Sequence, residues 1–190
     1  ELGDPGLNRF LLTSVDESIV RIEADGSGHT ALFGFAEYDD VTSLSWVDGT
    51  IYAGGGDNSV NAIDGSSGAF LWDVPMGRYE STSLAEPVIV IDGEHGYAIG
   101  VPGVVTAIRL ADRHIDWEYP LAPDGTTDGY YTSWRTPLVT DDLVYVGTGS
   151  SLDTNDVHAI DRATGARRWR LQLDHPDGDV PQAEIGRAHV

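Results

Sequence analysis

Residues 145–169, YVGTGSSLDTNDVHAIDRATGARRW, end with an acid, a Thr-Gly turn, two arginines and a tryptophan. Two other segments align with this stretch, YAGGGDNSVNAIDGSSGAFLW at 52–72 and YAIGVPGVVTAIRLADRHIDW at 97–117. These two align with each other without a gap, and residues 145–169 join them after one four-residue insertion. The closing tryptophans are 45 and 52 residues apart. A catalytic cluster is not expected three times in tandem, whereas a packing motif is, so the repeats indicate an architecture.

Each repeat is predicted to contain four short strands. In the second, SLSWV (43–47) precedes an Asp-Gly hairpin turn, and TIYAGG, SVNAID and AFLWDV follow. A fainter copy, LLTSVDESIVRIEADGSGHTA at 11–31, sets Ile22 against Ile63 and has Ala31 in place of the tryptophan. Four strands every 40 to 50 residues are typical of a β-propeller blade. The predicted fold class is therefore all-β, a partial β-propeller of about four four-stranded antiparallel blades in an incomplete ring.

The predicted propeller covers residues 1–183, with blades at about 9–35, 41–75, 81–121 and 130–174 and then the start of a further unit. Residues 184–190, EIGRAHV, resemble the translation of a sequencing adapter and are left out of the fold. The sequence opens on ELGDPGLNRF, without an initiator Met or a signal peptide, so an internal fragment is expected. Such a fragment cannot close a ring. It should form an open arc with exposed edge strands that associates or aggregates.

The composition is strongly acidic. The chain has 31 acidic and eleven basic residues, which gives a net charge of -20, and all eleven basic residues are arginine. This charge disfavours nucleic acid and anionic membrane surfaces as partners, and no apolar run reaches the roughly 20 residues of a membrane span. Without cysteine there is no disulfide or thiolate site. Two origins of the acidity stay open, adaptation to a high-salt cell and a GC-rich codon bias, and a steep rise of stability with molar KCl would indicate the first.

The motif A-x-D-x-x-[ST]-G-x-x-x-W is complete in the second and fourth repeats, and it resembles the repeat of the PQQ-like (pyrroloquinoline-quinone-type) β-propellers over about residues 9–173. The third repeat departs from it, with Arg109 and Arg113 in place of Asp and Gly. The resemblance implies that each tryptophan docks between the small residues of a neighbouring blade. The structural docking residues are then Ala62, Asp64, Gly68, Trp72, Ala107, Trp117, Ala159, Asp161, Gly165 and Trp169.

Individual side chains within these repeats are also assigned. Asp64 and Asp161 are expected to accept hydrogen bonds from backbone N–H groups of the following turn. None of the six histidines has a metal-ligand spacing, and His158, next to Ala159, is interpreted as a surface side chain. No catalytic, cofactor-binding or metal-ligating residue is assigned.

The PQQ-like family includes quinoprotein dehydrogenases, which hold PQQ and calcium or a lanthanide. It also includes non-catalytic propellers such as the lipoprotein of the outer-membrane β-barrel assembly machinery. The adjacent cysteine pair of many such dehydrogenases is absent here, and no Glu and Asn match the family's metal ligands. The prediction is a non-catalytic module for ligand or protein binding, without a cofactor. The alternative is a fragment of a PQQ- and Ca-dependent alcohol or sugar dehydrogenase. The resemblance alone places the protein outside the cytoplasm, in the periplasm or at the cell surface.

A ligand is expected at one end of the blades. In an antiparallel meander, the loops between blades lie at the same end as the loops between second and third strands. The fourth repeat carries its extra residues in these loops, APDGTTDGYYTSWR (122–135) and SSLDTND (150–156). Tyr, Trp and Arg dominate binding hot spots, so the aromatic and arginine side chains of these loops are predicted to bind the ligand. The alternative to ligand binding is that the aromatic side chains pack against the blade tops or the central channel. The predicted ligand-binding residues are Arg78, Tyr79, Tyr130, Tyr131, Trp134 and Arg135.

Overall fold

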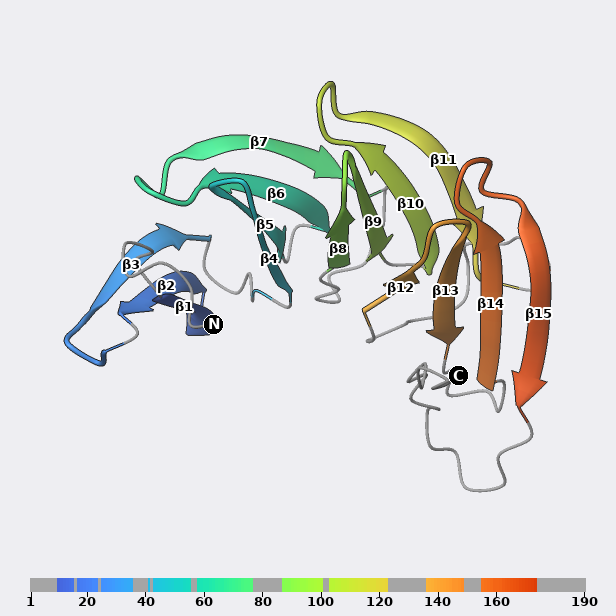
Figure 1. Cartoon of the computed structure of the whole chain (residues 1–190), viewed down its shortest axis with the longest axis horizontal. Coiled ribbons are helices and arrows are strands. Elements are labelled where there is room, and N and C mark those ends of the chain that lie inside the picture. Colours follow the sequence, from blue (N-terminus) through green and yellow to red (C-terminus); the bar gives the residue numbers. More distant parts are fainter. Residues whose placement is uncertain are drawn as a thin grey trace, which may run out of the picture.

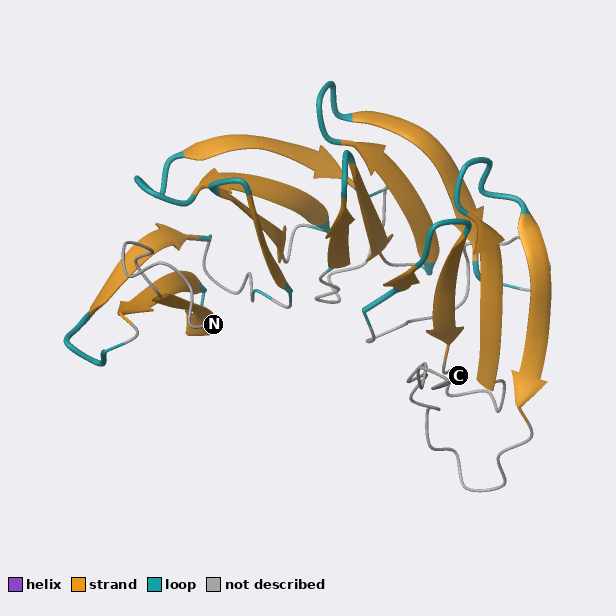
Figure 2. Ribbon diagram, in the orientation of Figure 1, coloured by secondary structure: helices purple, strands orange, loops and turns teal. Residues whose placement is uncertain are grey.

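A computed structural model of the chain describes residues 10–15, 17–23, 25–35, 41, 43–55, 58–76, 87–100, 103–122, 136–148 and 155–173. Every element in these ranges is a β-strand, and no helix there is long and apolar enough to span a bilayer. The strands form four antiparallel sheets that follow one another along an open arc (Figures 1 and 2). The predicted all-β partial propeller with an unclosed ring is confirmed.

Each sheet is a meander whose strands pair in chain order. The first contains β1 (Phe10–Val15), β2 (Ser18–Glu23) and β3 (His29–Gly34), so within the described residues it has three strands and not the expected four. The second contains β4 (Leu44–Val47), β5 (Thr50–Gly55), β6 (Ser59–Asp64) and β7 (Phe70–Pro75). The third contains β8 (Val88–Asp92), β9 (His95–Gly100), β10 (Val104–Arg109) and β11 (His114–Pro120). The fourth contains β12 (Leu138–Val139), β13 (Leu143–Thr148), β14 (Asn155–Asp161) and β15 (Arg167–Leu173), and Figure 1 shows β7, β11 and β15 on the convex side of the arc.

The repeated residues form one row across each sheet. In the third sheet Ala107 pairs with Tyr97 on one side and with Trp117 on the other, and a β-bulge follows at Ile108. The second and fourth sheets have the same row and the same bulge, and the paired residues are Tyr52, Ala62 and Trp72, then Tyr145, Ala159 and Trp169. Paired residues share a face of the sheet, so the small alanine lies between two large rings.

The turn after the third strand is also repeated. Asp64 Oδ1 accepts hydrogen bonds from the backbone N–H of Ser67 at 2.7 Å, and Asp161 Oδ1 accepts one from Thr164 at 2.9 Å, as predicted. Hydrogen bonds from the side chains of the same two residues lower the pKa of both aspartates most strongly. The third repeat lacks the Asp and Gly of the motif but still forms the turn. Its Arg113 has a φ of 63°, and the Arg113 N–H donates to the Arg109 carbonyl at 2.8 Å. A left-handed conformation at a non-glycine residue costs about 1 kcal/mol.

Apolar side chains fill the spaces between sheets. One buried cluster joins the first and second sheets, another the second and third, and another the third and fourth. The repeated isoleucine illustrates the pattern, since Ile63, Ile108 and Ile160 are each 0% exposed and each faces the preceding sheet. Ile22, in the first sheet, is only partly buried. Burial at this position therefore depends on a preceding sheet.

The glycines of these turns give a testable contrast. A Cβ on Gly68 would lie 1.9 Å from the Leu32 carbonyl oxygen of the first sheet, whereas one on Gly26 would meet nothing within 4 Å. Both glycines have a φ of +73°, so alanine is strained at either position. We expect Gly26→Ala to cost about 1 kcal/mol and Gly68→Ala about 2 kcal/mol in urea unfolding, because only the second change also forces two sheets apart. Equal costs would show that the sheet contact contributes nothing.

Candidate functional site

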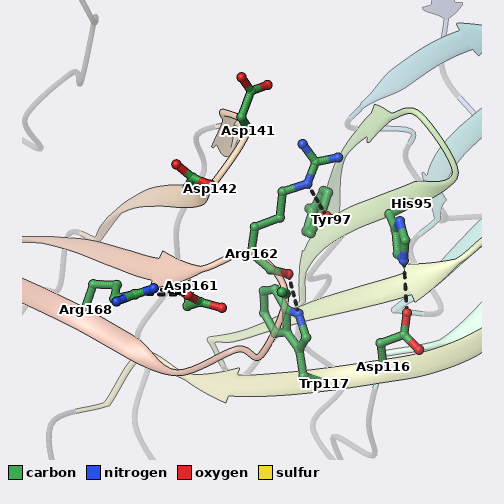
Figure 3. Close-up of a pocket in the computed structure, with 10 residues that line it drawn as sticks. His95, Tyr97, Asp116, Trp117, Asp141, Asp142, Asp161, Arg162 and Arg168 are labelled. Atoms are coloured by element: carbon green, nitrogen blue, oxygen red, sulfur yellow. Dashed lines mark hydrogen bonds and ion pairs between the residues drawn. The ribbon is translucent and has the colours of Figure 1, made fainter.

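A pocket of about 460 Å³ lies between the third and fourth sheets (Figure 3). It opens at the end of the sheets that carries the β12–β13 and β14–β15 turns. Thr148 and Asp156 pair at the other end of the fourth sheet. The third sheet contributes His95, Tyr97, Asp116 and Trp117, and the fourth contributes Asp141, Asp142, Asp161, Arg162, Ala163 and Arg168.

Arg162 ties the two sheets together across this pocket. Its Nε donates a hydrogen bond to the Tyr97 hydroxyl at 2.9 Å, and its Nη1 lies 2.7 Å from Asp92 Oδ2. The same nitrogen donates to the Thr140 carbonyl at 3.0 Å, and the guanidinium carbon lies 5.6 Å from the centre of the Tyr97 ring. Burial acts to lower the pKa of Arg162, but the Tyr97 and Asp92 contacts outweigh it and raise the pKa. The residue therefore stays charged.

Trp117 forms the inner wall. It is 8% exposed, and its Nε1 donates a hydrogen bond to the Arg162 carbonyl at 2.9 Å. A Cβ on Gly165 would lie 2.7 Å from two ring carbons of Trp117, so the indole rests directly on the glycine of the β14–β15 turn. The ring of Tyr97 lies 6.0 Å away in a tilted arrangement. The tryptophan of one sheet thus contacts the turn of the next.

Most of the other charged side chains of the pocket are paired, but Asp141 and Asp142 are not among the ion pairs of the described residues. His95 Nε2 lies 3.0 Å from Asp116 Oδ2, and Arg109 also pairs with this carboxylate. Arg168 Nε donates to Asp161 Oδ2 at 3.0 Å. The hydrogen bond from Arg109 lowers the pKa of Asp116, just as that from Thr164 lowers the pKa of Asp161. Each pKa shift found in the pocket keeps its group charged at neutral pH, so the site is suited to binding a polar or charged ligand.

A second polar cluster lies deeper between the same two sheets. His158 is 1% exposed, and its Nδ1 lies 3.0 Å from the Tyr119 hydroxyl of the third sheet. Asp156, also buried, is 2.7 Å from Arg170 Nη2. The interpretation of His158 as a surface residue is therefore wrong. It shares a face of β14 with Ile160, and that face packs against the third sheet, whereas Ala159 lies on the opposite face.

The predicted site residues fall into two groups. Arg78, Tyr79, Tyr130, Tyr131, Trp134 and Arg135 all lie outside the described residues. The repeat residues are described, and Trp117 and Asp161 line the pocket. Sequence reasoning assigned neither of them to a pocket, and it missed Arg162 altogether. In the described part of the chain, no three His, Asp or Glu side chains are grouped closely enough to hold a metal ion.

The comparisons with known proteins agree with the propeller fold. The family model described as outer membrane protein assembly factor BamB matches residues 37–188. No curated protein matches the chain significantly.

Among solved structures, BamB from Moraxella catarrhalis is 20% identical with a TM-score of 0.54, over 86% of this chain and 48% of that one. A europium-containing methanol dehydrogenase is 16% identical with a TM-score of 0.63, over 87% of this chain and 40% of that one. A quinohemoprotein alcohol dehydrogenase from Pseudomonas putida HK5 is 22% identical with a TM-score of 0.55, over 68% and 20% of the two chains. The chain thus spans about half or less of these proteins, and identities this low establish a shared fold alone.

Proposed function

Since the chain belongs to the PQQ-like β-propeller repeat family, whose matching model is described as outer membrane protein assembly factor BamB, we propose that it is a non-catalytic module that binds another protein or a ligand. The family match over residues 37–188 is the observation that carries this proposal. The charges of the pocket support it, because most of them are paired and each shifted pKa lies further from neutral pH than its ordinary value. We also propose a location outside the cytoplasm, as the description of the family suggests.

The proposed contact surface is the loop end of the blades. The described strands β11 and β13 end opposite the pocket, at Pro120 and Thr148, and the segments 122–135 and 150–156 follow them in the sequence. Tyr131 and Trp134 are the anchors we propose there. Aromatic anchors supply a large contact area at a small entropic cost. Arg135, which follows Trp134 in the sequence, adds a positive charge to a chain whose net charge is strongly negative.

The alternative is a piece of a PQQ- and Ca²⁺-dependent dehydrogenase. The chain shares its fold with a europium-containing methanol dehydrogenase as well as with BamB, so the fold is compatible with this reading too. Among the described residues no three His, Asp or Glu side chains group closely enough to hold a metal ion, so this part of the chain offers no acidic cluster for Ca²⁺. A dye-reduction assay with added PQQ and Ca²⁺ separates the two functions, and turnover of an alcohol would exclude the non-catalytic module.

The binding proposal predicts a separable defect. Tyr131→Ala combined with Trp134→Ala should abolish crosslinking of the chain to the protein it captures, because the anchor area is lost. The urea midpoint should stay unchanged. Phe70→Ala serves as the matched control, since Phe70 is an exposed aromatic residue on β7 in the second sheet. Loss of folding in the double variant, without a separable loss of binding, would instead show that these aromatics pack within the propeller.

A further inference from the structure

The pocket between the third and fourth sheets carries more negative than positive charge. Four carboxylates line its cavity of about 460 Å³ against two guanidinium groups, and the carboxylates are those of Asp116, Asp141, Asp142 and Asp161. His95, which is bonded to Asp116, adds at most one positive charge. Arg109 and Asp92, which bond to lining residues from outside the pocket, cancel each other. The pocket is therefore negative in either protonation state of His95.

The two guanidinium groups already have acceptors within the protein. Arg162 donates a hydrogen bond from Nε to the Tyr97 hydroxyl, and its Nη1 forms an ion pair with Asp92. Arg168 donates from both Nε and Nη2 to Asp161 Oδ2. An anionic ligand would have to compete with these carboxylates, so the arginines do not make the pocket an anion site.

Asp141 and Asp142 are the carboxylates that a ligand can reach without breaking a pair. Both are exposed in the turn between β12 and β13, and Figure 3 shows them apart from the His95–Asp116 pair. Within the described part of the chain, neither side chain forms an ion pair or a hydrogen bond. A positive group at this end of the pocket would meet two negative charges that have no other partner there.

The junction between the second and third sheets shows that docking two sheets does not require these charges. Leu110 stands at the repeat position of Arg162, and it packs on the apolar cluster of that junction together with Trp72. Leu71, in the second sheet, stands at the repeat position of Asp116. The same docking thus forms with leucines where the pocket has charged groups. Packing alone leaves the polar lining of the pocket unexplained.

We propose that this pocket binds an alkylammonium group, the chemistry shared by small aliphatic amines and the side chain of a lysine. The ammonium group would lie at Asp141 and Asp142, and the alkyl chain would lie along the inner wall that Trp117 forms. An organic cation suits the site better than a metal ion, because one wall is an indole and no three His, Asp or Glu side chains group together in the described ranges.

Size and long-range charge agree with this ligand. Small-molecule sites measure about 300 to 1,000 Å³, and the pocket falls within this range. The net charge of -20 attracts cations toward the chain from a distance. The site is separate from the proposed contact surface, because it lies at the opposite end of the sheets from Pro120 and Thr148.

An NMR titration tests the proposal through the Trp117 indole N–H, which is bonded to the Arg162 carbonyl beside the pocket. The probes are pentylamine and Nα-acetyl-lysine-N-methylamide, and the norleucine analogue, which lacks the ammonium group, is the neutral control. Both amines should shift the signal saturably with a Kd of about 1 mM or lower, and the norleucine analogue should not. Tighter binding of the lysine analogue than of pentylamine would identify the ligand as a protein lysine, and the reverse order would identify a free amine.

A double variant assigns the binding to the turn. Asp141→Asn combined with Asp142→Asn should raise the Kd of both amines at least about tenfold, because both unpaired charges are lost. Glu94→Gln is the matched control, since Glu94 is exposed at the repeat position of Asp142 in the third sheet, and it should leave the Kd unchanged.

Three results would overturn the proposal: no saturable shift with either amine, an equal shift with the norleucine analogue, or an unchanged Kd in a folded double variant. The norleucine comparison uses the unaltered chain, so it decides the matter even if the double variant does not fold. Loss of partner binding on changing Tyr131 and Trp134 bears only on the separate contact surface, so the two proposals can fail independently.

Discussion

Trp117→Ala is expected to lower the free energy of unfolding by about 3 to 5 kcal/mol, the range for a buried aromatic residue replaced by alanine. The indole lies in the cluster between the third and fourth sheets and rests on Gly165. Its removal opens a cavity and also leaves the Arg162 carbonyl without the 2.9 Å hydrogen bond from Nε1. Urea unfolding followed by far-ultraviolet circular dichroism measures the loss without relying on tryptophan fluorescence.

Trp169→Ala is the matched control for this prediction. Trp169 has the same place in its repeat and the same tilted contact with a tyrosine, but it is 44% exposed. Its loss should cost less than about 1 kcal/mol, because nearly half of the side chain is already in contact with water. If both variants lost the same stability, contact with the next sheet would not be what makes this tryptophan important.

The repeat alignment predicted the regular part of the fold. The repeats place Tyr97, Ala107 and Trp117 at fixed spacings in the sequence. Short hairpins and the two-residue side-chain period of a strand then bring them into one row across the sheet. The role of Asp64 in its turn was equally readable, since it depends on residues two and three positions away. The third repeat shows the limit of such a motif. Its turn forms although Arg109 and Arg113 replace the expected acid and glycine.

The pocket could not be read from the sequence, because its defining residue occupies a variable position of the motif. Gly65, Leu110 and Arg162 stand at that position in the last three repeats, and in each the backbone N–H bonds to the turn after the first strand. Only the third of them reaches polar partners in another sheet, and Tyr97 is 65 residues away in the sequence. His158 was misplaced for a related reason. In a sheet with one buried face, the residue next to a buried alanine points toward water. In β14 both residues are buried, because the third sheet covers the face of His158 and the rings of Tyr145 and Trp169 cover Ala159 on the other face.

The stability of the protein should fall as the pH drops from about 6.5 to about 4, and His158 is the expected cause. Burial lowers the pKa of His158 from 6.5 to about 4; the charges of Arg170 and Arg167 add to this, and Asp156 opposes it. The Tyr119 hydroxyl also contacts the ring, 3.0 Å from Nδ1. In this pH window the imidazole of His158 binds a proton in the unfolded chain but stays neutral in the folded chain. The free energy of unfolding should therefore fall by up to about 3 kcal/mol, with no contribution above pH 6.5.

Urea unfolding at a series of pH values measures this slope, and two variants assign it. His158→Asn keeps an acceptor near Tyr119 but cannot take up a proton, so the decline between pH 6.5 and 4 should flatten. His114→Asn should leave the decline intact, because His114 is exposed. The carboxylates whose pKa is lowered, Asp116 and Asp161 among them, withdraw their own stabilisation only as the pH falls below their ordinary value of 3.8. An undiminished slope in His158→Asn would therefore place the acid sensitivity on some group other than this buried imidazole.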